Sequence, residues 1–201
     1  MVLFRNQTFR MLWLAALASN FGGLVQAVGA AWMMTLLTDS QSMVALVQTS
    51  VSLPIVIFSL LAGVFADNFD RRRVMLVAQS FMLVVSVILA IMAFKELLSP
   101  WLLLSFTFLI GCGTALHNPS WQATMGDIVP RDDLPTAVAL NSMGFNMMRS
   151  IGPAVGGAIV ALAGVAAAFA VNAVSYIAII SALVRWHPPA RDLHLPREPF
   201  G

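Results

Sequence analysis

The stretch of sequence that decides the fold reads Gly63-Val64-Phe65-Ala66-Asp67-Asn68-Phe69-Asp70-Arg71-Arg72-Arg73. Six charged or amide side chains lie together here between two long apolar runs, in a chain of which only 10% is charged. Asp67 closes one predicted helix and the arginines open the next, whereas the helix macrodipole favours cations at C-termini and anions at N-termini. Such charges are tolerable only when they are solvated or have partners elsewhere, so this loop is a candidate functional element.

The composition on both sides of the loop is that of a membrane protein. Hydrophobic residues make up 59% of the 201 residues, and the mean hydropathy is +0.86. These values exclude a soluble domain with a charged surface. A helix needs about 20 apolar residues to cross the hydrocarbon core. The sequence predicts an all-α membrane protein with six spans, at residues 10–37, 42–66, 74–94, 100–128, 134–162 and 165–186.

The basic residues give the predicted bundle an orientation. With the N-terminus in the cytoplasm, Lys95 is the one basic residue outside and Arg149 lies within a span. The remaining arginines are then all on the cytoplasmic side, at positions 5, 10, 71, 72, 73, 131, 185, 191 and 197. By the positive-inside rule, both termini of this chain are predicted to be cytoplasmic. Residues 187–201 are polar and proline-rich, which is typical of a linker.

A competing interpretation concerns the first span. Arg10, the apolar run 11–17 and the triplet Ala16-Leu17-Ala18 are similar to a secretory signal with its cleavage site. However, the apolar run continues far past the triplet to Leu37, and the apolar core before the triplet is short. We therefore interpret this segment as a retained span.

The fifth predicted span contains Gly152-Pro153-Ala154-Val155-Gly156-Gly157. Gly152 and Gly156 are four residues apart, which creates a groove without side chains where another helix can approach. Pro153 cannot donate a hydrogen bond to the carbonyl four residues earlier, and its ring crowds that carbonyl. The motif predicts either tight helix packing or a moving hinge, and the residues alone leave both open.

Arg149 precedes this motif and lies about fifteen residues into its helix, near the bilayer midplane at about 1.5 Å per residue. An arginine at that depth needs a wet cavity or a partner. Ser142 and Asn146 share its face by their spacing, and no acidic residue lies equally deep in the predicted spans. We hypothesise that Arg149 attracts an anionic or acceptor-rich substrate. The alternative is pairing with backbone carbonyls and water.

Other spans carry polar side chains at helical spacing. Amides that face lipid are costly, so these side chains are expected to face inward. They either contact substrate or form hydrogen bonds between helices, and one sequence does not separate the two roles. The candidate cavity residues over all spans are Gln26, Asn118, Gln122, Asn146, Arg149, Asn172 and Tyr176.

Two of these motifs resemble signatures of the major facilitator superfamily. The charged loop is similar to the superfamily's pattern of a glycine, three residues, an aspartate, a spacer and a basic cluster. It departs from the pattern at Asp70 and Asn68, where glycine and a basic residue are common. The glycine-proline motif is similar to the exporter signature, although Met148 and Ala139 replace its earlier glycines. The combination most resembles the enterobactin-exporter-like branch, the transmembrane secretion effectors, over residues 5–185.

The resemblance implies twelve helices in two halves, with the substrate site between the halves and two inverted three-helix repeats in each half. This chain is then expected to be the N-terminal half, and its main partner the missing C-terminal half. In the family, the loop aspartate docks on a helix N-terminus of the other half. The resemblance therefore implies a conformational gate formed by Gly63, Asp67, Asp70, Arg71, Arg72 and Arg73, with Asp127 holding one arginine. The helix-packing hinge comprises Gly152, Pro153, Gly156 and Gly157.

The function implied by the resemblance is export of small organic molecules, such as siderophores or drugs, across a bacterial-type inner membrane. Proton antiport is the family expectation, although Thr107 occupies a place where many proton-linked members carry an arginine. The sequence contains no nucleotide-binding loop and no H-E-x-x-H motif. We therefore expect no enzyme activity, cofactor, metal or nucleic-acid partner. A transporter-like receptor or scaffold is the alternative.

Overall fold

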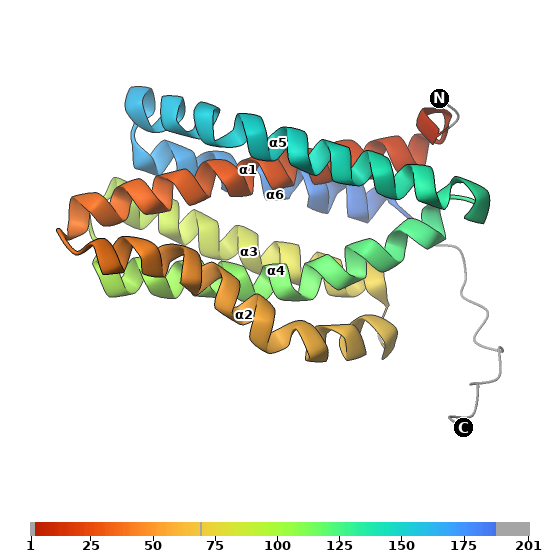
Figure 1. The fold of residues 1–201 in the computed structure, drawn as a ribbon, viewed down its shortest axis with the longest axis horizontal. Coiled ribbons are helices and arrows are strands. Elements are labelled where there is room, and N and C mark those ends of the chain that lie inside the picture. Colours follow the sequence, from red (N-terminus) through yellow and green to blue (C-terminus); the bar gives the residue numbers. More distant parts are fainter. Residues whose placement is uncertain (1–2, 69, 188–201) are drawn as a thin grey trace.

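The computed structural model describes residues 3–68 and 70–187, without the side chains of residues 59–68. These residues form a bundle of six long helices (Figure 1). The helices are α1 (Gln7–Leu37), α2 (Gln41–Asn68), α3 (Arg71–Phe94), α4 (Pro100–Ile128), α5 (Leu134–Ala163) and α6 (Val165–Arg185). Two short 3-10 turns, η1 (Leu3–Arg5) and η2 (Arg131–Asp133), precede α1 and α5. The predicted all-α architecture is confirmed, and a helix long and apolar enough to cross a membrane lies at each of the six predicted spans. Every helix end lies within three residues of the predicted position.

Local sequence explains where several helices begin. The side chain of Asn6 accepts hydrogen bonds from the backbone N–H groups of the first turn of α1. Ser99 does the same for α4, and Asp70 does so for α3. Between α5 and α6 the chain turns at Gly164, whose φ of 83° favours a residue without a side chain.

The packing has the twofold repeat that an inverted arrangement requires. α2 packs along α4 in the way that α5 packs along α1, and α3 packs on α4 as α6 packs on α1. The third helices of the two units, α3 and α6, pack on each other. In Figure 1, α1 and α5 form the upper part of the bundle, α2 and α4 the lower part, and α3 and α6 lie behind. Since each unit has three helices, the second unit begins at the opposite end of the bundle from the first.

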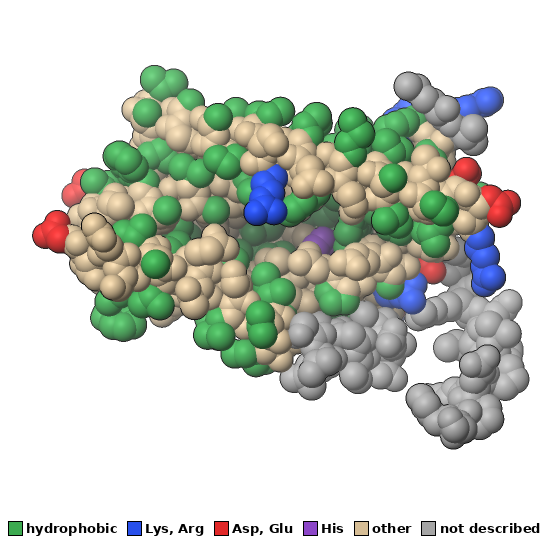
Figure 2. All heavy atoms as spheres, in the orientation of Figure 1, with side chains coloured by type: hydrophobic (Ala, Val, Ile, Leu, Met, Phe, Trp, Pro, Cys, Tyr) green, Lys and Arg blue, Asp and Glu red, His purple; other side chains and the backbone are tan. Residues whose placement is uncertain are grey.

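Two apolar clusters form the core, one toward each end of the bundle. The first surrounds Phe9, Met75 and Leu183, at the end where α1 begins and α6 ends. The second surrounds Met34, Leu89 and Phe169, toward the other end. Outside, apolar side chains cover the sides while charged ones gather mostly at the two ends (Figure 2). This distribution suits a bilayer, with the charges in the aqueous layers.

Candidate functional site

The charged loop is held by hydrogen bonds to helix ends. Arg71 Nη1 lies 2.9 Å from Asp127 Oδ2 and donates to the carbonyl oxygen of Ala123 at 2.9 Å, near the end of α4. The expected ion pair between Asp127 and one arginine is therefore present. Its side chains are 16% and 32% exposed, so water screens it only in part.

Arg72 reaches the end of a different helix. Its Nε donates to the carbonyl oxygen of Leu183 at 2.8 Å, and its Nη2 donates to that of Val184 at 2.7 Å. The macrodipole favours a cation at this C-terminus of α6. The arginines are thus less unfavourably placed than the sequence suggested. Although they belong to the first turn of α3, two of them act on the C-terminal ends of α4 and α6.

Two further gate residues, Asp70 and Arg73, lie at the start of α3. Asp70 caps α3, a favourable position for an anion. Arg73 is largely exposed and lies 3.8 Å from Asp70. The predicted gate roles of Gly63 and Asp67 fall outside the residues whose side chains the structure describes.

These contacts predict different effects for neighbouring arginines. Arg72→Ala should lower the free energy of unfolding by about 2 kcal/mol, because two carbonyl groups lose charge-assisted hydrogen bonds. Arg73→Ala should change it by less than about 0.5 kcal/mol, since exposed ion pairs contribute little. Denaturant unfolding of the detergent-solubilised protein, followed by circular dichroism, measures both values. Equal effects of the two substitutions would contradict this account of the loop.

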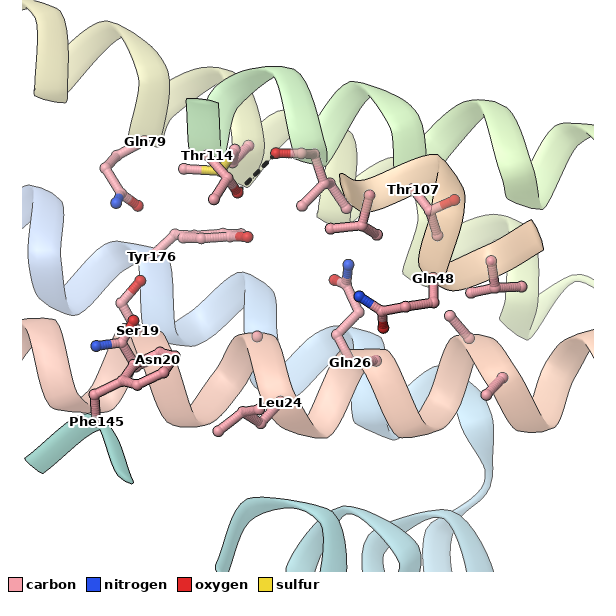
Figure 3. Close-up of a pocket in the computed structure, with 18 of the residues that line it drawn as sticks. Ser19, Asn20, Leu24, Gln26, Gln48, Gln79, Thr107, Thr114, Phe145 and Tyr176 are labelled. Carbon is pink, nitrogen blue, oxygen red and sulfur yellow. Dashed lines mark hydrogen bonds between the residues drawn. The ribbon is translucent and has the colours of Figure 1, made fainter. Parts of the chain in front are cut away.

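A cavity of about 350 Å³ lies between the helices, about midway along the bundle (Figure 3). On the described residues its lining includes no charged side chain. The polar part of the wall comes from five helices: Ser19, Asn20 and Gln26 of α1, Gln48 of α2, Gln79 of α3, Thr107 and Thr114 of α4, and Tyr176 of α6. Such a wall can offer hydrogen bonds to an uncharged ligand, but no ion pair.

Part of this wall is fixed by a buried polar network between α1, α3 and α6. Gln26 Oε1 accepts hydrogen bonds from Asn172 Nδ2 at 2.6 Å and from Ser86 Oγ at 2.9 Å. Asn172 Nδ2 also donates to the hydroxyl oxygen of Tyr176 at 3.1 Å. All four side chains are buried. Because buried polar networks of this kind hold side chains in one geometry, the cavity wall is preorganised here.

The predicted cavity residues divide into two groups. Gln26 and Tyr176 line the cavity, and Asn172 lies directly behind them. The other four are exposed on α4 and α5: Asn118, Gln122, Asn146 and Arg149. They are not part of this cavity's lining, and their contact with substrate stays a prediction. Their exposure follows from the packing, because α5 packs mainly on α1 and α4 mainly on α2 and α3. One face of α4 and of α5 is thus left uncovered by the described residues.

The sequence reasoning missed Gln79 and Gln48 as cavity residues. Gln79 is the one amide between residues 74 and 94, in an otherwise strongly apolar span. That isolation was the available signal, since an amide within a span is expected to have a role. Gln48 is near the start of α2, where polar residues are common and carry no such signal.

The glycine-proline motif makes contacts that its spacing predicts. A side chain built at Gly152 would lie 2.8 Å from the Leu24 side chain, and one at Gly156 would lie 3.1 Å from the Cα atom of Val25. Gly157 meets nothing within 4 Å. α5 therefore approaches α1 closely through the first two glycines, while the hinge role stays a prediction.

Comparison with known proteins gives consistent similarities. Residues 1–201 match a family described as transmembrane secretion effector. The staphyloferrin A transporter of Staphylococcus aureus is 27% identical over 164 residues, which cover 81% of this chain and 41% of that protein. The MFS-type transporter YkuC of Bacillus subtilis is 28% identical, over 98% of this chain and 44% of that protein. Macrolide efflux protein A of Streptococcus pyogenes is 24% identical, over 73% and 36%. The chain spans less than half the length of these relatives.

Proposed function

Because the chain belongs to the transmembrane secretion effector family of the major facilitator superfamily, we propose that it is half of a secondary active exporter. The chain is an integral, multi-pass membrane protein with six candidate spans. In the proposal, residues 1–186 form the N-terminal half of a twelve-helix carrier and residues from 187 on begin the connection to the second half. Both termini of this chain face the cytoplasm, and the membrane is a bacterial inner membrane.

The observation that carries this proposal is the polar stripe on the uncovered faces of α4 and α5. Asn118, Asn146 and Arg149 are exposed there, in the middle parts of two apolar helices, and Gln122 is exposed one turn after Asn118. An arginine and two amides at mid-helix depth are too costly to face lipid. They need a water-filled path or another protein surface, and a second six-helix half provides both. Substrate would then pass between the halves by alternating access.

The substrate class follows from the relatives and from the charges of the stripe. Two relatives are named for a siderophore and for macrolides, which are both small organic molecules. In the proposal, Arg149 attracts an anionic or acceptor-rich part of such a molecule. Proton antiport is the proposed source of energy, and its support is the family alone.

The gate is proposed to work through Asp67. The contacts of Arg71 and Arg72 fix the start of α3 to the ends of α4 and α6. A loop held at this one end can present the Asp67 carboxylate to the positively charged N-terminus of a helix from the second half. Opening and closing of the carrier would break and remake that contact.

Transport by the full-length protein in proteoliposomes tests the proposed function. Vesicles are loaded with a macrolide or with an iron-free siderophore, and a proton gradient is imposed. The expected result is efflux that depends on the gradient and that an uncoupler abolishes. Binding of these compounds without any efflux would favour a receptor role instead.

The gate predicts that Asp67→Asn lowers the efflux rate roughly tenfold while membrane insertion is unchanged, because a neutral amide interacts weakly with a helix N-terminus. The matched control is Asp39→Asn, at the exposed loop between α1 and α2 at the opposite end of the bundle. Efflux is compared at equal amounts of inserted protein. Equal losses of efflux and insertion in Asp67→Asn would point to a purely topological role.

A further inference from the structure

The cavity contains a buried amide oxygen without a partner. Gln79 is 1% exposed, and no donor among the described residues reaches its Oε1. Buried polar atoms in proteins are nearly always hydrogen-bonded, so each exception calls for an explanation. Figure 3 shows the Gln79 side chain directed from α3 into the cavity, toward the ring of Tyr176 and across from Ser19. The free acceptor therefore belongs to the cavity wall.

Two further polar groups, of Gln26 and Tyr176, face the same space. Both lone-pair directions of Gln26 Oε1 are occupied by Ser86 and Asn172, so the Nε2 group of Gln26 is left to donate. The Tyr176 hydroxyl has Asn172 and Ser86 as side-chain partners, which leaves one of its three hydrogen-bonding positions for the cavity. Gln26 and Tyr176 both line the cavity. The wall thus combines one unused acceptor with polar groups whose orientation is fixed from behind.

The remaining wall determines the charge of the ligand. It combines apolar side chains, Leu24, Val47, Met82 and Ile110 among them, with uncharged polar ones such as Asn20 and Gln48. No charged residue belongs to it on the described residues. An ion in such a site would lose its hydration without gaining a counter-charge. An uncharged group that both donates and accepts hydrogen bonds satisfies this wall. A hydroxyl group does so with one donor and two acceptor positions.

We propose that this cavity is a subsite for an uncharged, hydroxyl-bearing part of the substrate. Hydroxyl groups of this part donate to Gln79 Oε1 and form hydrogen bonds with the Tyr176 hydroxyl or with Gln26 Nε2. The inference deepens the proposed transport function and rests on it, since it assumes that substrate reaches the cavity from the path between the halves. The cavity wall and Arg149 then bind different parts of the substrate. Arg149 lies outside this cavity and binds an anionic or acceptor-rich part.

Thiol-reactive probes of matched size test this subsite without a transport substrate. Ser19→Cys places a thiol on the cavity wall across from Gln79, in full-length protein without other cysteines, which in this chain requires Cys112→Ala. Hydroxyethyl and propyl methanethiosulfonate differ only by a hydroxyl in place of a methyl group. The ratio of their reaction rates is measured at Ser19→Cys and at Ser105→Cys, an exposed position on α4 that controls for partition into the detergent.

The expected ratio favours the hydroxyethyl reagent about fivefold more at Ser19→Cys than at Ser105→Cys, the factor that one net hydrogen bond represents. Gln79→Met keeps the side-chain volume without the acceptor, and Tyr176→Phe removes only the hydroxyl. Each should bring the ratio toward that of Ser105→Cys. If one of these two variants does not purify as a monodisperse protein, the proposal is tested with the rate ratios of the other variant and of the parent protein.

Two results overturn the proposal. One is equal selection at Ser19→Cys and Ser105→Cys, as expected for a cavity that holds water only or that accepts any small molecule. The other is selection that neither Gln79→Met nor Tyr176→Phe reduces. Because the assay involves no efflux, its failure is distinct from failure of the proposed function. If the hydroxyethyl reagent is preferred at Ser19→Cys but the protein shows no efflux in vesicles, the proposed subsite stands and the proposed exporter function is rejected.

Discussion

Gly111→Ala should destabilise the six-helix bundle by about 3 kcal/mol, toward the upper end of what overpacking costs. A Cβ atom at this position would clash with the backbone carbonyl oxygen of Val51 and would lie 2.9 Å from Pro54 Cγ. A backbone oxygen cannot move aside as a flexible side chain can, so α2 as a whole would have to shift from α4. Since the charged loop begins within the last two turns of α2, we expect transport to be lost together with stability.

The same helix offers a matched control. Gly126 also lies in α4, and a Cβ atom there meets nothing within 4 Å. Gly126→Ala should therefore leave the stability unchanged or raise it by up to about 1 kcal/mol, because alanine favours the helix more than glycine does. Thermal unfolding of both detergent-solubilised variants measures the difference. If Gly111→Ala is as stable as Gly126→Ala, the close contact of α2 and α4 is not present in the protein.

The helices could be predicted from the sequence because their signal is local. Long apolar runs separated by short polar breaks determine each span, and Gly164 marks a turn between two of them. The ion pair of Arg71 with Asp127 was also foreseeable. Both residues belong to spans that end at the same side of the membrane, and a cation there needs a partner.

The wall of the cavity could not be predicted, because it depends on which helices pack together. Gln79 lines the cavity because α3 packs beside α1 and α6, and no residue of these helices donates a hydrogen bond to its Oε1 atom. The sequence alone shows neither the packing nor the missing donor. Conversely, Asn118 and Asn146 follow the spacing of inward-facing residues, yet they lie on faces that this unit leaves uncovered. Helical spacing tells which residues share a face, but not what covers that face.

Arg149→Ala should lower efflux of an anionic substrate on the order of 10- to 100-fold, because one or two hydrogen bonds from a charged donor contribute about 1.5–3 kcal/mol each. Arg149→Lys should retain part of the rate, since it keeps the charge but loses the planar, bidentate geometry. Arg131→Ala, at the exposed turn before α5, is the control for general effects of removing an arginine. Efflux in proteoliposomes is compared at equal insertion.

The contrast between two substrates makes this test sharp. Arg149 lies on the uncovered face of α5, whereas the uncharged wall around Gln79 lies inside the bundle. A neutral substrate with several hydroxyl groups should therefore depend on Gln79 and Tyr176 and lose much less from Arg149→Ala than an anionic one. Unchanged efflux of both substrates in Arg149→Ala would mean that backbone carbonyls and water solvate this arginine, with no role in recognition. An equal loss for both would instead assign Arg149 to the conformational change, because only recognition of charge separates an anion from a neutral molecule.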